Sequence, residues 1–386
     1  MKAMTPRERF LTACNHQEPD RIPLALGGTA NKMYESTMRA AMDFYGIPQN
    51  EIEFYPAGFK YVPFCEKLYE YMEIDTRTLY PMSSSKEMMD AQMNQGVFVN
   101  RWGSKFEYHD SDAEWANLGL DLPLDKENLT VEEVLNYKWP RPDKSLTVGL
   151  REKALKYATK GKYAVGVYRV LECGIFGSIH NCLRGMIPFM MDMVADPELA
   201  EALLDGMLET QKAFYGAVLD EVGDLVDYVE TEDDMGMQDR PLVSPELYHE
   251  MIMPRHKALY DFIKSKSRPG VKVFQHSDGA IRDLIPDYIE AGVDILNPLQ
   301  VTCKGMDLKE IKAEFGDRLV FNGGIDVQLS FEGSMDQAKD AVKRAIDILA
   351  PGGGYILGGT HNYSPHIPLE KVLMVFEFAK EYGRYR

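Results

Sequence analysis

A histidine and an aspartate stand two residues apart in FQHSDGAIRDLI, residues 274–285, where a predicted strand gives way to a helix. Side chains at positions i and i+2 of a strand point to the same side, so His276 and Asp278 would face one cavity. Gly279 would let the backbone turn sharply after them. Neutral imidazole and carboxylate oxygen both bind zinc. The spacing predicts a metal or acid–base site, although an Asp278 that caps the next helix beside a hydrogen-bonded His276 would give the same pattern.

A second imidazole strengthens the metal interpretation. His361 directly follows a predicted strand, in GGTHNYSPHIP at residues 358–368. In a barrel this position neighbours the early strands and opens on the same end of the molecule. Two imidazoles and one carboxylate leave a fourth zinc position free for substrate or water. We therefore predict that His276, Asp278 and His361 bind Zn²⁺ and act in catalysis.

An acidic run follows another predicted strand, with Glu230, Glu232, Asp233 and Asp234 inside five residues. Four carboxylates cannot all be buried and ionised without a cation or hydrogen-bond donors. One of them is expected to bind the metal or to be a general acid with a raised pKa, while the others cap or solvate the loop. The run alone does not choose among them. We take Glu232 as a catalytic candidate and Glu230 as a substrate-binding candidate.

Further polar residues follow the next predicted strands and are expected to contact the substrate. In FNGGID, residues 321–326, the two glycines would allow a flat ligand to approach the backbone, and Asp326 would bind a donor on that ligand. A tight turn with Asp326 as a helix cap explains the same residues. The substrate-binding candidates beyond Glu230 are Asn297, Gln300, Asn322 and Asp326.

Strands and helices alternate from about residue 150 onwards, which predicts right-handed βαβ units and a parallel sheet. With IPLALGG at residues 22–28 as a further strand, the series fits a single (β/α)8 TIM-type barrel of the α/β class, spanning residues 1–386. An open, doubly wound sheet is the alternative, but no strand is followed by a GxGxxG or P-loop motif. The other predicted strands cover residues 163–170, 225–230, 271–276, 294–300, 318–324 and 353–359.

Residues 1–150 form an elaborated N-terminal part of this domain, with helical pieces and a β-excursion at 96–109. Capping boxes at Thr5 and Thr130 predict the starts of two helices. Farther along, helices are predicted at residues 146–160 and from the Asp196–Pro197 signal to about 222, and a glycine-containing loop at 171–178.

The bulk composition excludes some partners. With 43 basic and 60 acidic residues the net charge is −17, which argues against nucleic acid or an anionic membrane as the main partner. No stretch approaches the roughly 20 apolar residues of a membrane span, and MKAMTPRERF lacks the apolar core of a signal peptide. Five cysteines without a CxxC pair indicate free thiols in a reduced, cytoplasmic protein.

Five segments stand out together, namely EPDRIP (18–23), SPELYHEMIMPRHKALYDFIK (244–264), HSDGAIRDLIPDYIEAGVDILNPLQ (276–300), FGDRLVFNGGIDVQ (315–328) and APGGGYILGGTHNYSPHIPLEKV (350–372). These linked segments are similar to those of the uroporphyrinogen decarboxylase superfamily, and the resemblance covers essentially the whole chain. It implies a single (β/α) barrel with additional N-terminal helices. The decarboxylases of this superfamily carry an arginine-rich RQAGR-type segment that grips substrate carboxylates, whereas this chain has LALGGTANKMY in that region.

The other large branch of the superfamily comprises cobamide-dependent methyltransferases, whose coenzyme M members bind zinc through His-x-Cys and a later cysteine. Their histidine matches His276, their first cysteine matches Asp278 and their later cysteine matches His361. Both thiolates are replaced by residues that also bind metal. Imidazole and carboxylate donate less charge than thiolates, so the zinc would be a stronger Lewis acid toward oxygen.

This resemblance implies an O-demethylase-type methyltransferase. It would move a methyl group from a small methylated compound, with a methoxylated aromatic favoured, to the cob(I)amide of a separate corrinoid carrier protein. The alternative is a metal-free decarboxylase of the uroporphyrinogen decarboxylase type that acts on another carboxylic acid. A third class, a catalytically silent binding barrel, would have neither zinc nor activity.

Overall fold

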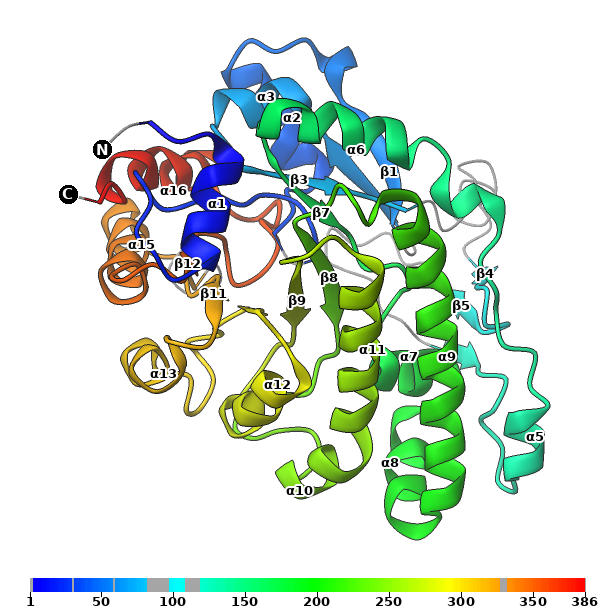
Figure 1. Ribbon diagram of the computed structural model, residues 1–386. Helices are drawn as coiled ribbons and strands as arrows, with labels where there is room; N and C mark the ends of the chain where they lie inside the picture. The colour runs from blue at the N-terminus through cyan, green and yellow to red at the C-terminus, as the bar shows by residue number, and fades with distance from the viewer. Residues whose placement is uncertain are drawn as a thin grey trace.

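A parallel sheet dominates the computed structural model, which describes residues 3–29, 31–57, 60–81, 97–107, 119–326 and 332–385. Seven strands pair side by side in the order β12-β11-β10-β9-β8-β7-β3, and every pair is parallel. Helices surround this curled sheet in Figure 1. The strands are β3 (Thr76–Leu79), β7 (Ala164–Val167), β8 (Tyr228–Glu232), β9 (Lys272–His276), β10 (Ile295–Asn297), β11 (Val320–Asn322) and β12 (Tyr355–Ile356).

The segment around Leu24 closes the sheet into a barrel. On one side, Ala25 N–H donates to Leu357 O and Leu357 N–H donates to Pro23 O. On the other side, Asp75 N–H donates to Leu24 O. The segment predicted as a strand at 22–28 therefore lies between β12 and β3 as the eighth member. The (β/α)8 prediction is confirmed, and the open sheet is set aside.

Most of the predicted helices are present with the predicted caps. Thr5 and Thr130 both form capping boxes, and α9 runs over Pro197–Val222 as the Asp196–Pro197 signal indicates. The helices of the second half are α7 (Ile175–Cys182), α8 (Met186–Ala195), α9, α10 (Pro245–Leu247), α11 (Met253–Lys266), α12 (Ile285–Ala291), α13 (Leu308–Phe315), α15 (Met335–Leu349) and α16 (Leu369–Tyr382).

Two local predictions were wrong. Residues 171–178 were expected to form a loop, but α7 begins at Ile175. Its glycines serve close packing, because a Cβ on Gly174 would stand 1.7 Å from the Glu232 carbonyl oxygen at the end of β8. The helix predicted at 146–160 begins only at Leu150, since Gly149 takes a left-handed conformation with φ of 72° just before it.

The N-terminal elaboration combines short helices with two small antiparallel sheets. The β-excursion predicted at 96–109 contributes β4 and β5, and its positions 96, 108 and 109 lie outside the described residues. The elements are α1 (Pro6–Cys14), α2 (Glu35–Phe44), β1 (Glu53–Ala57), β2 (Lys60–Phe64), α3 (Glu66–Tyr71), β4 (Val97–Val99), β5 (Lys105–Glu107), β6 (Gly119–Asp121), α5 (Val131–Leu135) and α6 (Leu150–Ala158).

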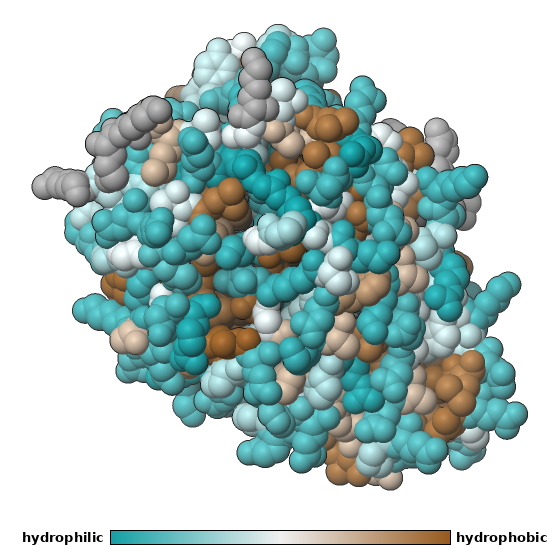
Figure 2. All heavy atoms as spheres, in the orientation of Figure 1, coloured by the Kyte–Doolittle hydropathy of each residue, from teal (hydrophilic) through white to brown (hydrophobic). Residues whose placement is uncertain are grey.

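Helix α1 covers the end of the barrel at which the strands begin. Its Phe10 is 2% exposed and packs with Tyr228, Phe274 and other side chains of the barrel interior. The ring of Phe10 lies 5.2 Å from that of Tyr228. This end is thus closed by apolar packing. On the face shown in Figure 2, hydrophilic side chains predominate, with smaller apolar patches among them.

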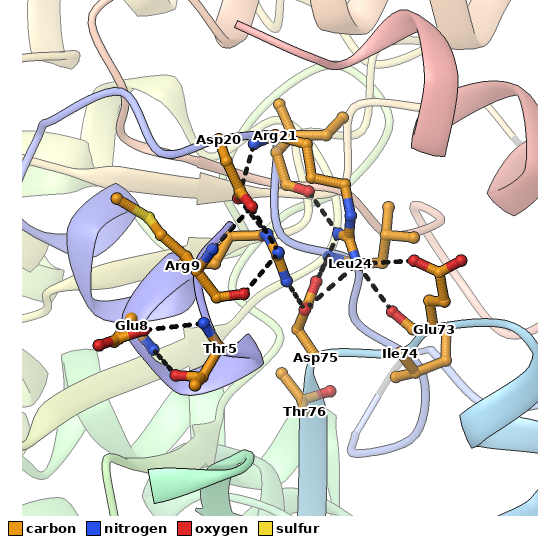
Figure 3. A network of polar contacts seen from close by, with 12 residues as sticks. Thr5, Glu8, Arg9, Asp20, Arg21, Leu24, Glu73, Ile74, Asp75 and Thr76 are labelled. Atoms are coloured by element: carbon orange, nitrogen blue, oxygen red, sulfur yellow. Dashed lines mark hydrogen bonds and ion pairs between the residues drawn. The ribbon is translucent and has the colours of Figure 1, made fainter. Parts of the chain in front are cut away.

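A buried ionic network lies at the same closed end (Figure 3). Asp75, which is 0% exposed, accepts from Arg9 Nη1 at 2.6 Å and from Arg21 Nη1 at 2.7 Å. It also accepts from Leu24 N–H at 2.7 Å, and Asp20 accepts from Arg9 Nε at 2.6 Å. We call these four charged residues, Arg9, Asp20, Arg21 and Asp75, the basal network. It ties α1, the closing segment and β3 together.

Candidate active site at the barrel mouth

Three ligand-type side chains gather where β8 and β9 end. His276 is the last residue of β9, and its Nε2 lies 3.6 Å from Asp234 Oδ1 and 3.8 Å from Asp278 Oδ2. Each of the three residues offers one ligand atom within 4.8 Å of the other two. The backbone holds them in place, because Asp278 N–H donates to Asp234 Oδ1 at 2.9 Å. We call Asp234, His276 and Asp278 the mouth cluster.

His361 comes to the same mouth but stands at its edge. Its Nε2 lies 4.0 Å from Asp278 Oδ2, on the loop after β12. It is not one of the three residues whose ligand atoms all lie close together. The structure therefore brings the three predicted ligands into one region. It also places Asp234, which the sequence did not single out from the acidic run, beside His276.

The sharp turn after Asp278 is present as predicted. Gly279 has φ of 95°, and a Cβ there would stand 2.4 Å from the backbone of Gly236. Gln300 supports the same turn, because its Oε1 accepts from Gly279 N–H at 2.7 Å. A side chain at position 279 would separate the two loops that carry Asp234 and Asp278.

Two asparagines hold the His276 ring from inside the barrel. His276 Nδ1 lies 2.6 Å from Asn297 Oδ1, and Asn297 Nδ2 donates to Asn322 Oδ1 at 2.7 Å. All three side chains are nearly fully buried. Burial also lowers the pKa of His276, so its imidazole stays neutral near neutral pH. The sequence predicted Asn297 and Asn322 as substrate contacts, and the structure shows them bonded to each other, with Asn297 also bonded to His276.

The first two acids of the run, Glu230 and Glu232, have different partners. Glu230 Oε2 accepts from the backbone N–H and from the hydroxyl of Thr29, each at 2.8 Å. Burial raises the pKa of Glu230 to about 7, although Thr29 opposes the shift. Glu232 forms an ion pair with Arg169 instead. Glu232 is thus held by a cation of the segment after β7.

The next acid, Asp233, faces the helix layer. Its carboxylate accepts from Phe176 N–H at 2.8 Å and from Gly177 N–H at 2.6 Å, at the start of α7. His256 Nε2 lies 2.9 Å from the same carboxylate. Asp233 thus anchors α7 to β8, and only Asp234 of the run joins the mouth cluster.

Three groups beside this site escaped the sequence prediction. Arg169 and Tyr168 follow β7, which ends at Val167, and Arg169 Nε donates to the Tyr168 hydroxyl at 3.2 Å. Lys32 Nζ lies 5.4 Å from the centre of the Tyr168 ring. Although burial alone would raise the pKa of Tyr168, Arg169 and Lys32 lower it. Arg169 lay within the predicted strand 163–170, and a shorter strand would have placed it among the strand-end residues.

A cavity of about 220 Å³ opens next to the mouth cluster. Its walls are mainly polar and include both Asp278 and His361. Two predicted substrate-binding residues, Gln300 and Asp326, also line it. The lining is completed by Val301, Thr302 and Thr360. The cavity thus connects the predicted substrate residues of the loops after β10, β11 and β12 with the ligand-type residues.

The comparisons with known proteins fit this architecture. The family model described as Uroporphyrinogen decarboxylase (URO-D) matches residues 178–382, more than half of the chain. A methyltransferase from Methanosarcina mazei has a similar structure, with a TM-score of 0.62 and 16% identity over 98% of this chain and 99% of that one. At that identity the likeness shows the fold alone.

A proposed vitamin-B12 independent methionine synthase from Listeria monocytogenes matches with 9% identity and a TM-score of 0.43, over 94% of this chain and 99% of that one. No curated protein matches the sequence. Within the described residues, no helix has the length and apolarity needed to cross a membrane.

Proposed function

The chain belongs to the uroporphyrinogen decarboxylase family, and we propose that it is a zinc-dependent methyltransferase acting with a corrinoid carrier protein. It would take a methyl group from a small methylated compound and deliver it to the cob(I)amide of that carrier. The observation that carries the proposal is the mouth cluster, in which one imidazole and two carboxylates converge at the end of the barrel used for catalysis. The structural likeness to a methyltransferase supports the fold that the reaction needs.

The mouth cluster fits zinc in donor type and spacing. Tetrahedral zinc with bonds of about 2.0–2.2 Å separates its ligand atoms by roughly 3.4 Å. The distances from His276 Nε2 to the two carboxylates, 3.6 and 3.8 Å, are close to this value. Asp234, His276 and Asp278 would hold the ion, and His361 would stand beside it as a fourth ligand or as a donor to the substrate. This ligand set keeps two of the three predicted residues and adds Asp234.

Zinc bound here would supply Lewis acidity toward the oxygen of a methyl ether, which makes the alkoxide or phenoxide a better leaving group. The protein itself would orient the donor. Gln300 and Asp326 line the cavity next to Asp278, where they can bind hydroxyl groups of the substrate. A cavity of about 150 Å³ is enough for benzene, so a cavity of about 220 Å³ accommodates one methoxylated ring. A methoxylated aromatic therefore stays the favoured donor.

Glu230 and Glu232 would determine the protons and charges available next to the substrate. With a pKa of about 7, Glu230 can hold a proton at neutral pH and would donate a hydrogen bond to the substrate. Glu232 would contribute to catalysis as the charged partner of Arg169. The two roles can be tested separately, because Glu230→Gln and Glu232→Gln each remove only one of them.

The proposal is tested with purified protein, a reduced corrinoid carrier and a panel of methoxyarenes. We expect stoichiometric zinc by elemental analysis and methylation of the carrier, followed by its absorption spectrum. His276→Ala should remove the zinc and lower the methylation rate by at least about 100-fold. His366→Ala, a histidine exposed on the same loop as His361, is the matched control and should retain both.

Three outcomes would overturn the proposal. Methyl transfer that persists in His276→Ala would exclude the mouth cluster as the metal site. A protein that holds no zinc and releases CO₂ from a carboxylic acid would instead be the metal-free decarboxylase. A protein with neither zinc nor activity would be a silent binding barrel.

A further inference from the structure

Four neighbouring strands end in a single line of hydrogen bonds inside the barrel. In the register of the sheet, Asn297 of β10 is paired with His276 of β9, and Asn322 of β11 is paired with Ile356 of β12. His276 Nδ1 lies 2.6 Å from Asn297 Oδ1, Asn297 Nδ2 lies 2.7 Å from Asn322 Oδ1, and Asn322 Nδ2 lies 3.1 Å from Ile356 O. The line thus connects a ring of the mouth cluster to the main chain of β12.

The direction of every bond in this line is fixed by main-chain carbonyl groups. Ile356 O can only accept, so the amide nitrogen of Asn322 must face it and the amide oxygen of Asn322 must face Asn297. Asn297 is fixed a second time, because its Nδ2 also lies 3.3 Å from the main-chain oxygen of Asn322. Turning both amides over would set oxygen against oxygen at both carbonyls, which is costly at residues that are 1% and 2% exposed.

We infer that Asn297 and Asn322 are positioning residues that lock His276 as the Nδ1–H tautomer and aim the Nε2 lone pair at Asp234 and Asp278. Asn297 Oδ1 accepts, so Nδ1 must carry the proton. In the neutral imidazole the other ring nitrogen then carries no proton and can bind a metal ion. The inference rests on the proposed function only in its use of zinc, because the tautomer is a property of the metal-free protein.

The first consequence of this inference is that substitutions in the line of asparagines change the affinity of the protein for zinc. We expect Asn297→Ala to weaken zinc binding by about 10- to 100-fold, the usual loss when a ligating histidine loses its hydrogen-bond partner. Asn322→Ala should cost less, because Asn297 keeps its second anchor, the main-chain oxygen of residue 322. Asn297→Asp keeps the acceptor for Nδ1–H but loses the donor to Asn322 Oδ1, so it should be less stable than wild type and yet bind zinc more tightly than Asn297→Ala. Asn181→Ala, which removes a half-buried amide outside this line, is the control.

Nitrogen-15 NMR of the histidine rings, recorded on the metal-free protein, measures the second consequence. Wild type and Asn297→Asp should show a protonated Nδ1 and an unprotonated Nε2 at His276, and Asn297→Ala should lose this pattern. A His276 protonated at Nε2 in the wild-type protein, or zinc affinity unchanged in Asn297→Ala, would overturn the inference.

The two experiments also separate this inference from the proposed function. Wild-type protein that binds no zinc would refute the proposed metal site, while the NMR measurement would still decide the tautomer. A merely structural role for the asparagines would lower stability in Asn297→Ala and in Asn297→Asp alike, without the rescue of the Nδ1–H signal by aspartate.

Discussion

The two ends of the barrel hold charged groups in opposite ways. In the basal network two arginines face two aspartates, and the buried Asp75 contacts both guanidinium groups (Figure 3). In the mouth cluster two carboxylates lie beside a buried imidazole whose pKa is lowered. Matched charges at the closed end stabilise the fold, whereas like charges brought together at the open end work against it. Such an arrangement is retained where it serves a site.

The strongest test of this contrast is Asp75→Asn. The substitution keeps the shape of the side chain but leaves Arg9 and Arg21 without their shared charge in a buried place. Removing one partner of a buried ion pair costs about 3–5 kcal/mol of the free energy of unfolding. Urea denaturation measures the loss, and zinc affinity of the folded fraction should be unchanged.

The surface pair Arg151–Asp224 supplies the control for this prediction. Both side chains are exposed, and the ion pair measures 2.8 Å. Asp224→Asn should cost less than about 1 kcal/mol, as exposed ion pairs usually do. Equal losses at Asp75 and Asp224 would show that the basal network does not stabilise the barrel through its buried charges.

Glu230 differs from both Asp75 and Asp224. Its carboxyl is buried and bonded to Thr29, and within the described part of the chain it forms no ion pair. Its folded-state pKa of about 7 exceeds the ordinary value of 4.5. The folded state therefore keeps its proton where the unfolded state has lost it, and stability falls as pH rises from about 4.5 to about 7. The ionised form costs about 3 kcal/mol above this range.

Glu230→Gln removes the titration and hence the penalty. The difference in free energy of unfolding between variant and wild type should move by about 3 kcal/mol in favour of the variant between about pH 4.5 and about pH 8. Urea denaturation at several pH values measures it. A difference that stays constant with pH would show that Glu230 titrates normally.

Local sequence signals predicted the barrel well because each one acts within a few residues. The predicted strand 271–276 became β9 at Lys272–His276, and the capping box at Thr130 begins α5 as predicted. The failure at 171–178 has a long-range cause. The glycines that suggested a loop instead let α7 approach the end of β8, some sixty residues away along the chain.

The candidate site was predicted from side chains that follow the ends of predicted strands. His276 and Asp278 share a strand end, and barrel closure brings His361 to them. Asp234 joins because β8 pairs with β9 so that Glu232 stands opposite His276. That register depends on the whole sheet, and the sequence of either strand alone does not contain it. The bond between Asn297 and Asn322 escaped prediction for the same reason.

The smallest predicted change in the free energy of unfolding is that of Asp278→Asn in the mouth cluster, and its sign depends on whether zinc is present. The variant removes one of two neighbouring carboxylates, which are partly exposed and screened by solvent. Without metal it should gain about 0.5–1 kcal/mol in the free energy of unfolding. With zinc at 100 times the wild-type Kd, wild type gains about 2.7 kcal/mol, and the variant, which lacks one ligand, gains far less. The order of stability should therefore reverse when zinc is added, as measured by thermal unfolding with and without a chelator. A variant that is less stable in both conditions would mean that Asp278 stabilises the fold as Asp75 does, and the contrast between the two ends would fail.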